Sequence, residues 1–126
     1  MTARRRGDLF DPECPTRQLL DRVGSKWTAM CVLVLDETGT ELRFSELKRQ
    51  MSGISQKVLT ETLRALERDG LLTRRVEPTS PPRVHYGLTA RGQSLAAPLR
   101  QLRWWAEENM PGVDDHRRLY DRKRAR

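Results

Sequence analysis

One stretch of the sequence combines polar side chains of the kinds that recognise nucleic-acid bases with the spacing of a single exposed helix face. Within the segment 55–69 these side chains are Ser55, Gln56, Lys57, Thr60 and Arg64. A glutamine amide can pair bidentately with adenine, and a lysine or an arginine can pair with guanine. We therefore expect this face to contact base edges in the major groove of DNA. The alternative is an ordinary helix face that contacts only solvent.

The other side of the same segment is apolar. At about 100° per residue, six side chains gather opposite Lys57 and Arg64, and these are Val58, Leu59, Thr62, Leu63, Ala65 and Leu66. Ser55 is placed to cap the first turn, and Gly70 is placed to end the helix. The pattern predicts an amphipathic helix that packs on one side and keeps its polar side outward.

The residues before this helix predict a shorter helix that leads into it through a tight turn. We expect Ser45 to cap the shorter helix, Leu47 and Met51 to be buried, and Gly53 to be the break. A turn of about four residues between two helices is typical of a helix-turn-helix unit. In such a unit the second helix enters the major groove.

After Gly70 the apolar period changes from that of a helix to that of a strand. Residues 72–76 and 84–88 alternate between apolar and polar side chains, and prolines separate the two runs. The pattern predicts a two-stranded hairpin with a proline-bearing tip. Arg74 falls on the side of Leu72, so its stem is expected to cover the core. Arg75 and Arg83 are expected to contact DNA.

Three further helices complete the expected fold, which is mainly α with a small two-stranded β-hairpin. The first should run from Pro15 to Gly24, and the second, nearly apolar all round, should lie at the centre between Ser25 and Gly39. The last should begin after Thr89 and stop at Pro111. We expect residues 1–13 to form a flexible arm, residues 14–110 to form the domain, and residues 111–126 to form a charged tail.

Size and composition limit the possible functions. The chain has 126 residues, enough for one domain, and a formal net charge of +7, which favours a polyanionic partner. No apolar run approaches the ~20 residues that span a membrane, and the N-terminus lacks the apolar stretch of a signal peptide. We therefore expect a cytoplasmic protein. We expect no metal site or cofactor, because the two cysteines lack CxxC spacing. We also expect no enzyme, because the sequence shows no catalytic triad and no phosphate-binding loop.

Four blocks of the sequence resemble the HxlR-type family of bacterial transcription regulators. They are "GSKWT", "RFSEL", "GISQKVLTETLRALERDGL" and "PPRVHYGLTARG", in the family's order and spacing, within a stretch from Cys14 to about Trp105. The resemblance implies a winged helix-turn-helix fold, binding to a DNA operator, and a homodimer built by the first and last helices.

The resemblance also implies roles for individual residues. The family's exposed DNA-facing positions match the five polar residues of the segment 55–69, its wing arginine matches Arg83, and Arg43 is expected near a phosphate. We expect the dimer interface to include Leu19, Leu99, Leu102, Trp104 and Trp105. Because adjacent residues cannot share one helix face, one tryptophan is expected to pack on its own domain and the other on the partner.

Cys14 is the candidate sensor. It precedes a helix start, where the helix dipole can lower the pKa of a thiol, and several family members sense oxidants or electrophiles with a cysteine at this place. The alternative is a residue that only packs. Cys31 lies in the helix expected to be buried, so we expect it to act as a small apolar side chain.

These observations favour a dimeric, sequence-specific transcription regulator, a repressor rather than an activator. It should bind a palindromic or near-palindromic site in double-stranded DNA and respond through Cys14 or through a small ligand in the dimer cleft. Two main alternatives remain open at this stage, beside a weaker third, an RNA-binding protein, which is disfavoured because the major groove of A-form RNA does not admit a helix. One is a winged-helix module that binds protein, which would show apolar residues in place of Lys57, Thr60 and Arg64. The other is a small-molecule-binding protein whose DNA affinity is incidental.

Overall fold

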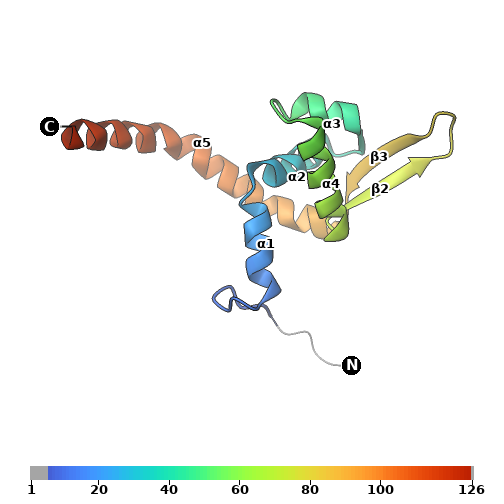
Figure 1. Ribbon diagram of the computed structural model, residues 1–126, viewed down its shortest axis with the longest axis horizontal. Coiled ribbons are helices and arrows are strands. Elements are labelled where there is room, and N and C mark those ends of the chain that lie inside the picture. The colour runs from blue at the N-terminus through green and yellow to red at the C-terminus, as the bar shows by residue number, and fades with distance from the viewer. Residues whose placement is uncertain (1–5, 126) are drawn as a thin grey trace.

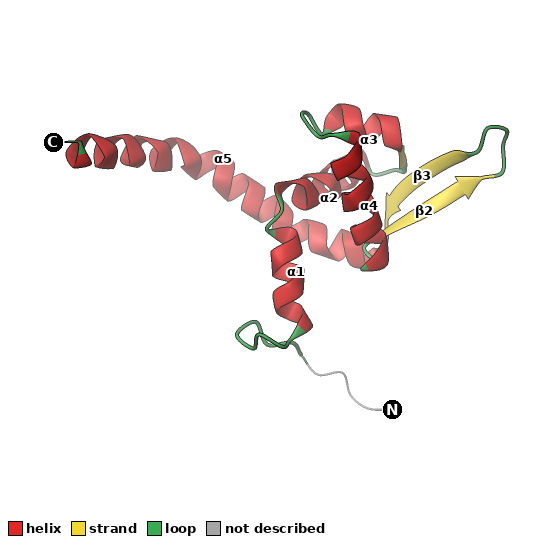
Figure 2. Cartoon of the chain, in the orientation of Figure 1, coloured by secondary structure: helices red, strands yellow, loops and turns green. Residues whose placement is uncertain are grey.

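The computed structural model describes residues 6–125, which form five helices and a three-stranded antiparallel sheet (Figure 1). The elements are α1 (Pro15–Val23), α2 (Lys26–Thr38), β1 (Leu42–Arg43), α3 (Phe44–Gln50), α4 (Gln56–Arg68), β2 (Leu72–Glu77), β3 (Arg83–Leu88) and α5 (Ala90–Arg124). The β2–β3 hairpin projects from one side of the helices as a wing (Figure 2). The predicted fold class, a mainly α winged helix-turn-helix, is confirmed.

The core forms around α2, the helix whose sequence is apolar almost all round. Cys31 and Val32 are fully buried and Leu35 is nearly so. This helix packs against α1, α3, α4 and α5. Ser25 and Gly39 flank it as predicted, and Gly39 adopts a positive φ of 69°, a conformation that glycine reaches without steric cost.

The helix-turn-helix unit consists of α3, a short turn and α4. Leu47 and Met51 are fully buried, as predicted. The predicted cap of α3, Ser45, is wrong, because the helix begins at Phe44 and its N-cap lies two residues before Ser45. Arg43 occupies the N-cap position, and its backbone amide donates to the Glu46 carboxylate at 3.0 Å. A glutamate three residues after the cap satisfies an amide there.

The sheet contains one strand more than the sequence predicts. The hairpin strands β2 and β3 are confirmed, and β1 pairs with β3 on its other side, with Leu42 opposite Tyr86. A strand of two residues is too short to show an alternating pattern, so sequence periodicity could not reveal it. Its effect is to tie the start of α3 to the base of the wing.

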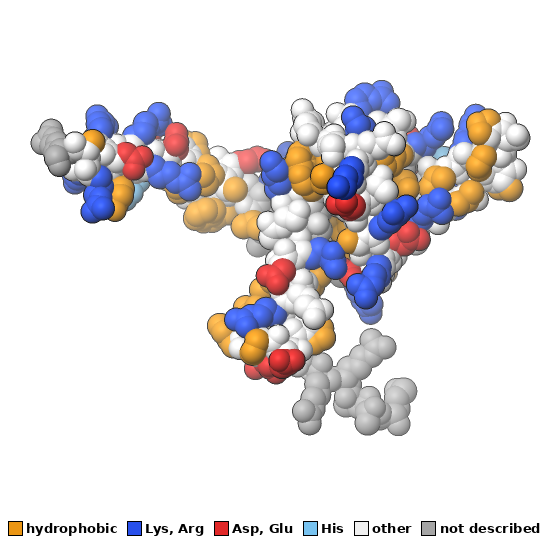
Figure 3. Space-filling model, in the orientation of Figure 1, with side chains coloured by type: hydrophobic (Ala, Val, Ile, Leu, Met, Phe, Trp, Pro, Cys, Tyr) orange, Lys and Arg blue, Asp and Glu red, His pale blue; other side chains and the backbone are white. Residues whose placement is uncertain are grey.

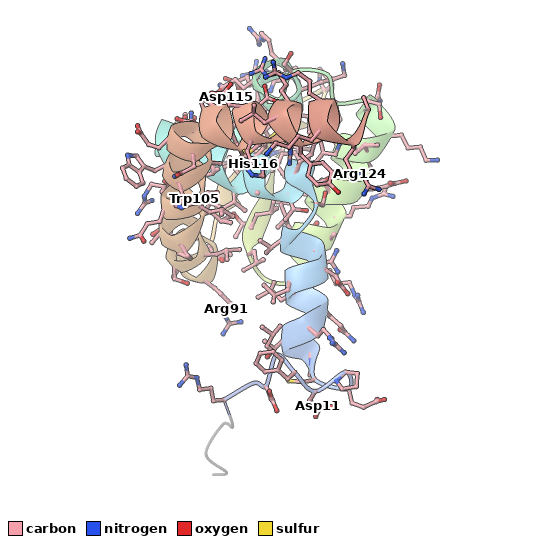
Figure 4. All side chains as sticks on the ribbon, turned by 90° about the vertical axis from the view of Figure 1, so that its left-hand side faces the viewer. Asp11, Arg91, Trp105, Asp115, His116 and Arg124 are labelled. Carbon is pink, nitrogen blue, oxygen red and sulfur yellow. The ribbon has the colours of Figure 1, made fainter. Side chains whose placement is uncertain are left out.

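The last helix is longer than predicted. Pro111 does not end it, and α5 continues to Arg124 with both Pro98 and Pro111 inside it. A proline removes one backbone hydrogen bond and bends a helix without always ending it. Figure 4 shows the bend, between the segment that carries Trp105 and the segment that carries Asp115. The expected charged tail is therefore helical through Arg124.

The expected N-terminal arm is described only in part, because residues 1–5 lie outside the described residues. Residues 8–14 form hydrogen-bonded turns that end at α1. The Asp11 amide donates to the Asp8 carbonyl at 3.3 Å, and the Cys14 amide donates to the Asp11 carbonyl at 3.0 Å.

Gly92 allows the start of α5 to approach the loop before β2. Its amide donates to the Thr89 hydroxyl at 3.0 Å. A Cβ added at this position would lie 2.0 Å from the Leu71 carbonyl oxygen and 3.1 Å from Leu88 Cδ2. We expect Gly92→Ala to lower the free energy of unfolding by about 1–3 kcal/mol, because backbone atoms would have to shift. Urea denaturation at fixed protein concentration measures this loss.

Gly112→Ala is the matched control. Gly112 lies inside α5, and no atom lies within 4 Å of a Cβ added there. Since alanine is favoured over glycine in a helix interior by about 1 kcal/mol, this substitution should raise the stability slightly. Equal losses from both variants would contradict the explanation by close approach.

Candidate nucleic-acid interface

The outward side of α4 carries the polar residues that the sequence singles out. Ser55, Gln56, Lys57 and Arg64 are exposed and Thr60 is half-buried, while Leu59, Leu63 and Leu66 on the other side are buried. We call the five polar residues the α4 face. Figure 3 shows lysine and arginine side chains gathered over α3, α4 and the wing.

Local hydrogen bonds orient two hydroxyl side chains of the α4 face. The Ser55 Oγ accepts from the Val58 amide at 3.1 Å, which caps the helix as predicted. The Thr60 hydroxyl donates to the Gln56 carbonyl at 2.8 Å. Thr60 therefore has its hydroxyl hydrogen already engaged, and its methyl group remains for apolar contact.

Arg74 continues the α4 face onto the wing. A hollow of about 370 Å³ between α3, α4 and the sheet is lined by Phe44, Thr60, Leu63, Arg64, Glu67, Arg74 and Tyr86. Arg74 and Arg64 thus share one hollow. Arg74 was not among the predicted DNA-facing residues, although the alternation that placed it on the side of Leu72 was the signal for its position beside α4.

Arg75 points to the other side of the sheet. Its Nη2 lies 2.8 Å and its Nε 3.0 Å from Glu41 Oε1, so the guanidinium forms an ion pair with that carboxylate through two hydrogen bonds. This hydrogen bond lowers the pKa of the Glu41 carboxyl. The strand register places Arg75 on the same side of the sheet as Arg83, which is the side away from Arg74. The contact of Arg75 with DNA stays a prediction, and its ion pair with Glu41 competes with such a contact.

The remaining predicted DNA-facing residues lie at the two ends of the sheet. Arg83 begins β3 and is exposed, with its Cα opposite that of Glu77. Arg43 ends β1 at the N-cap of α3 and is also exposed. Between them, His85 Nε2 lies 3.0 Å from Glu77 Oε2, and this hydrogen bond lowers the pKa of the Glu77 carboxyl. The structure therefore places Arg43 at the base of the wing and Arg83 near its tip.

The residues predicted for a dimer interface divide into two groups. Leu19, Leu102, Trp104 and Trp105 are exposed, with Trp104 at 65% and Trp105 at 52%. Neither tryptophan is enclosed by its own domain, contrary to the expectation for one of them. The prediction for Leu99 is wrong, because this side chain is 4% exposed and belongs to the core of its own chain. Leu99 occupies the stripe of α5 that faces α2.

The two cysteines have opposite environments. Cys14 is half-buried at the N-cap of α1, and its sulfur lies 3.4 Å from the Thr16 hydroxyl and accepts from the Asp8 amide at 3.2 Å. The hydrogen bond with Thr16, followed by that with Asp8, lowers the pKa of the Cys14 thiol. Cys31 is fully buried, as predicted, and burial raises its pKa to about 12.

A second hollow, of about 510 Å³, lies between α1, the end of α4 and the start of α5. Leu19, Leu71 and Leu95 supply apolar lining, and Arg91 supplies a positive charge. At its rim Arg22 Nε lies 2.5 Å from Asp69 Oδ2, which ties α1 to the C-cap of α4.

Residues 6–125 hold no group of three or more His, Cys, Asp and Glu side chains placed to bind a metal ion. Among the same residues, no helix has the length and apolar character needed to cross a bilayer.

Comparisons with known proteins agree with this geometry. Residues 22–114 match the family described as HxlR-like helix-turn-helix. The Escherichia coli protein named uncharacterized HTH-type transcriptional regulator YtfH is 42% identical over 107 residues, which cover 85% of this chain and 83% of that protein.

Solved structures show the same similarity. A putative transcriptional regulator, ytfH from Salmonella typhimurium, has 39% identity and a TM-score of 0.81, covering 90% of this chain and 99% of that one. A reduced form of the redox regulator HypR has 34% identity and a TM-score of 0.72, covering 80% and 98%. The chain therefore belongs to the HxlR-like helix-turn-helix family, as the resemblance in its sequence predicted.

Proposed function

We propose that this protein is a homodimeric, sequence-specific DNA-binding regulator of transcription that acts as a repressor. The observation that carries the proposal is the α4 face, which is polar and exposed on a helix whose other side is buried. Its family and its named relatives, which are transcriptional regulators, support the same reading.

The α4 face is suited to the major groove by both shape and chemistry. The groove is about 12 Å wide and admits one helix. Gln56 can pair with adenine, while Lys57 and Arg64 can pair with guanine. The Thr60 methyl group is available for a thymine methyl, since its hydroxyl hydrogen is engaged with the Gln56 carbonyl. The positive end of the helix dipole at Ser55 favours a neighbouring phosphate.

The residues around α4 supply contacts that position the protein on the duplex. Arg74 extends the polar face from the hollow it shares with Arg64. We assign Arg83, near the wing tip, to the backbone or an adjacent minor groove, and Arg43 to a phosphate. Contacts of this kind fix register without reading sequence.

In a two-fold symmetric homodimer, each subunit would present its own α4 face to the DNA. Two α4 helices in successive major grooves lie about 34–36 Å apart, and the site they read is palindromic or nearly so. Bound there, the dimer would block access of polymerase. A protein-binding module fits the α4 face less well, because it would be expected to show apolar side chains at Lys57, Thr60 and Arg64.

The signal for regulation is proposed to act at Cys14. The lowered pKa of this thiol increases its thiolate fraction, and thiolates are the species that oxidants and electrophiles attack. The similarity to the redox regulator HypR supports this choice. A small effector is the alternative, and the hollow between α1 and α5 is large enough for one.

The reading surface can be tested by selecting bound duplexes from a random pool and titrating the selected site. We expect Lys57→Ala and Arg64→Ala each to weaken binding by about 1–3 kcal/mol and to relax sequence preference. Arg74→Ala should weaken binding, whereas Arg75→Ala and Arg118→Ala, which remove the same charge elsewhere, should have smaller effects. Unchanged affinity and motif in the first two variants would exclude this surface.

The assembly can be tested with two leucines one turn apart on α5. Leu102→Ala should raise the dissociation constant of the dimer, measured by sedimentation velocity, because this exposed side chain is assigned to the interface. Leu99→Ala should instead lower the free energy of unfolding by about 2–5 kcal/mol at any protein concentration, because Leu99 fills the core. A wild-type protein that stays monomeric at micromolar concentration would contradict the proposed dimer.

The sensor can be tested by alkylation with iodoacetamide across a pH series, read by mass spectrometry. Cys14 should react at lower pH than an ordinary thiol, and Cys31 should stay unlabelled in the folded protein. Thr16→Val should move the Cys14 profile to higher pH, because the hydrogen bond that lowers the pKa is lost. If oxidant changes the DNA affinity of Cys14→Ser as much as that of the wild type, Cys14 is not the sensor.

A further inference from the structure

Phe10, an apolar residue just before α1, has a side chain that is exposed to solvent. Phe10 is 85% exposed and Leu9 is 39% exposed, yet both belong to an ordered turn. Asp8 Oδ1 accepts from the Phe10 amide at 3.0 Å, and Asp11 Oδ1 accepts from the Glu13 amide at 3.0 Å. We call residues 8–13 the N-terminal turn. A phenylalanine held outward on a fixed backbone is of the kind that anchors protein interfaces.

The N-terminal turn is also acidic. It contains Asp8, Asp11 and Glu13 and no basic residue, which gives it a local charge of −3 by this count of three acidic side chains. Arg6 precedes the turn and is exposed. A partner surface for this turn therefore needs an apolar patch surrounded by positive charge.

The end of α5 offers such a surface. Beyond Pro111, the side chains that share the side of Tyr120 at about 100° per residue are Val113, His116, Arg117, Lys123 and Arg124. We call these six residues the arm face. Tyr120 is 55% exposed, and the Arg124 guanidinium lies 5.9 Å from its ring centre, which confirms that these two residues lie together.

Two of the three acidic residues of this part of α5 lie away from the arm face, and the third, Asp121, flanks it about 40° from Arg117. Asp114 and Asp115 hold Arg118 at 3.0 Å and 2.8 Å. Figure 4 shows His116 and Arg124 on the side of the helix toward α1 and Asp115 on the opposite side. The arm face is therefore apolar at its centre and basic at its edges, with a count of +3 from Arg117, Lys123 and Arg124, which becomes +2 when the flanking Asp121 is included.

The two surfaces do not meet within one chain. The end of α5 and the segment before α1 project from the helical body in different directions (Figure 1). Both surfaces also lie mainly outside residues 22–114, the part of the chain that matches the family.

We propose that the N-terminal turn of one copy docks on the arm face of a second copy, with Phe10 against Tyr120 and Val113 and the three acidic side chains beside the three basic ones. This inference rests on the proposed homodimer and names a contact that would extend its interface. Under two-fold symmetry the contact forms twice. The acidic charge of the N-terminal turn complements the basic charge of the arm face, which supports a second copy as the partner. If DNA bound the arm face instead, the exposed Phe10 would have no partner.

Charge reversal on each side tests the contact. The turn variant Asp8→Asn, Asp11→Asn, Glu13→Lys keeps side chains that can form the same turns and changes the local count from −3 to +1. The arm variant Arg117→Glu, Lys123→Glu, Arg124→Glu changes the count from +3 to −3. Each variant alone should raise the dimer dissociation constant, measured by sedimentation velocity, by about tenfold.

Mixing the two variants separates this contact from its alternatives. Each heterodimer carries two contacts between opposite charges, so the mixture should form heterodimers in preference to either homodimer, as read by native mass spectrometry. A contact within one chain would give no such preference. Circular dichroism checks folding, and if either variant misfolds, Phe10→Ala and Tyr120→Ala take their places, each with about a tenfold loss expected.

The outcomes distinguish the inference from the proposed function. A monomeric wild type overturns the homodimer and the docking together. A dimeric wild type whose association neither variant weakens overturns the docking alone. For the charge variants, weakened association without preferential heterodimers also overturns the docking and would assign the arm face to a contact within its own chain. An arm variant that loses only DNA affinity overturns the docking as well and would assign the arm face to DNA.

Discussion

The packing of α4 against α2 is the contact on which the candidate interface depends. Leu59 and Leu66 are fully buried and Leu63 is nearly so, and burial of one such side chain stabilises the fold by about 1.5–3 kcal/mol. Because three leucines on one side of the helix must stay inside, the rotation of α4 about its axis is fixed. That rotation decides which polar side chains point outward, so the reading surface follows from the core.

The sheet extends this constraint to the wing. Leu42 pairs with Tyr86 and Arg74 pairs with Tyr86 from the other side, so one residue of β3 sets the register of both its neighbours. Alternation along β2 then places Arg74 beside α4 and Arg75 beside Glu41. Two arginines adjacent in sequence acquire different surroundings for this reason alone, and their shared charge gives no sign of the difference.

The sequence predicted those features that depend on one element at a time. The amphipathic division of α4, the caps at Ser55 and Thr89, and the two wing strands all follow from local periodicity and capping chemistry. Features set by tertiary contacts were missed. Leu99 and Leu102 belong to the same apolar stripe, but only packing against α2 decides that Leu99 is inside. Pro111 ends many helices, yet here the bend that it introduces is accommodated because this part of α5 projects into solvent.

The first helix connects the candidate sensor to the candidate reading surface. It has nine residues and none of them is buried, and isolated helices shorter than about 12–15 residues are marginal in water. Its stability must therefore come from contacts outside the helix, such as the packing of Val23 against the core and the ion pair of Arg22 with Asp69. Cys14 occupies the N-cap position at its start, and Arg22 in its last turn binds Asp69 at the end of α4. A chemical change at Cys14 that displaces α1 would thus disturb the ion pair that holds the end of α4. The Cys14 thiol therefore has a physical route, through α1 and Arg22, to the end of the helix that carries the α4 face.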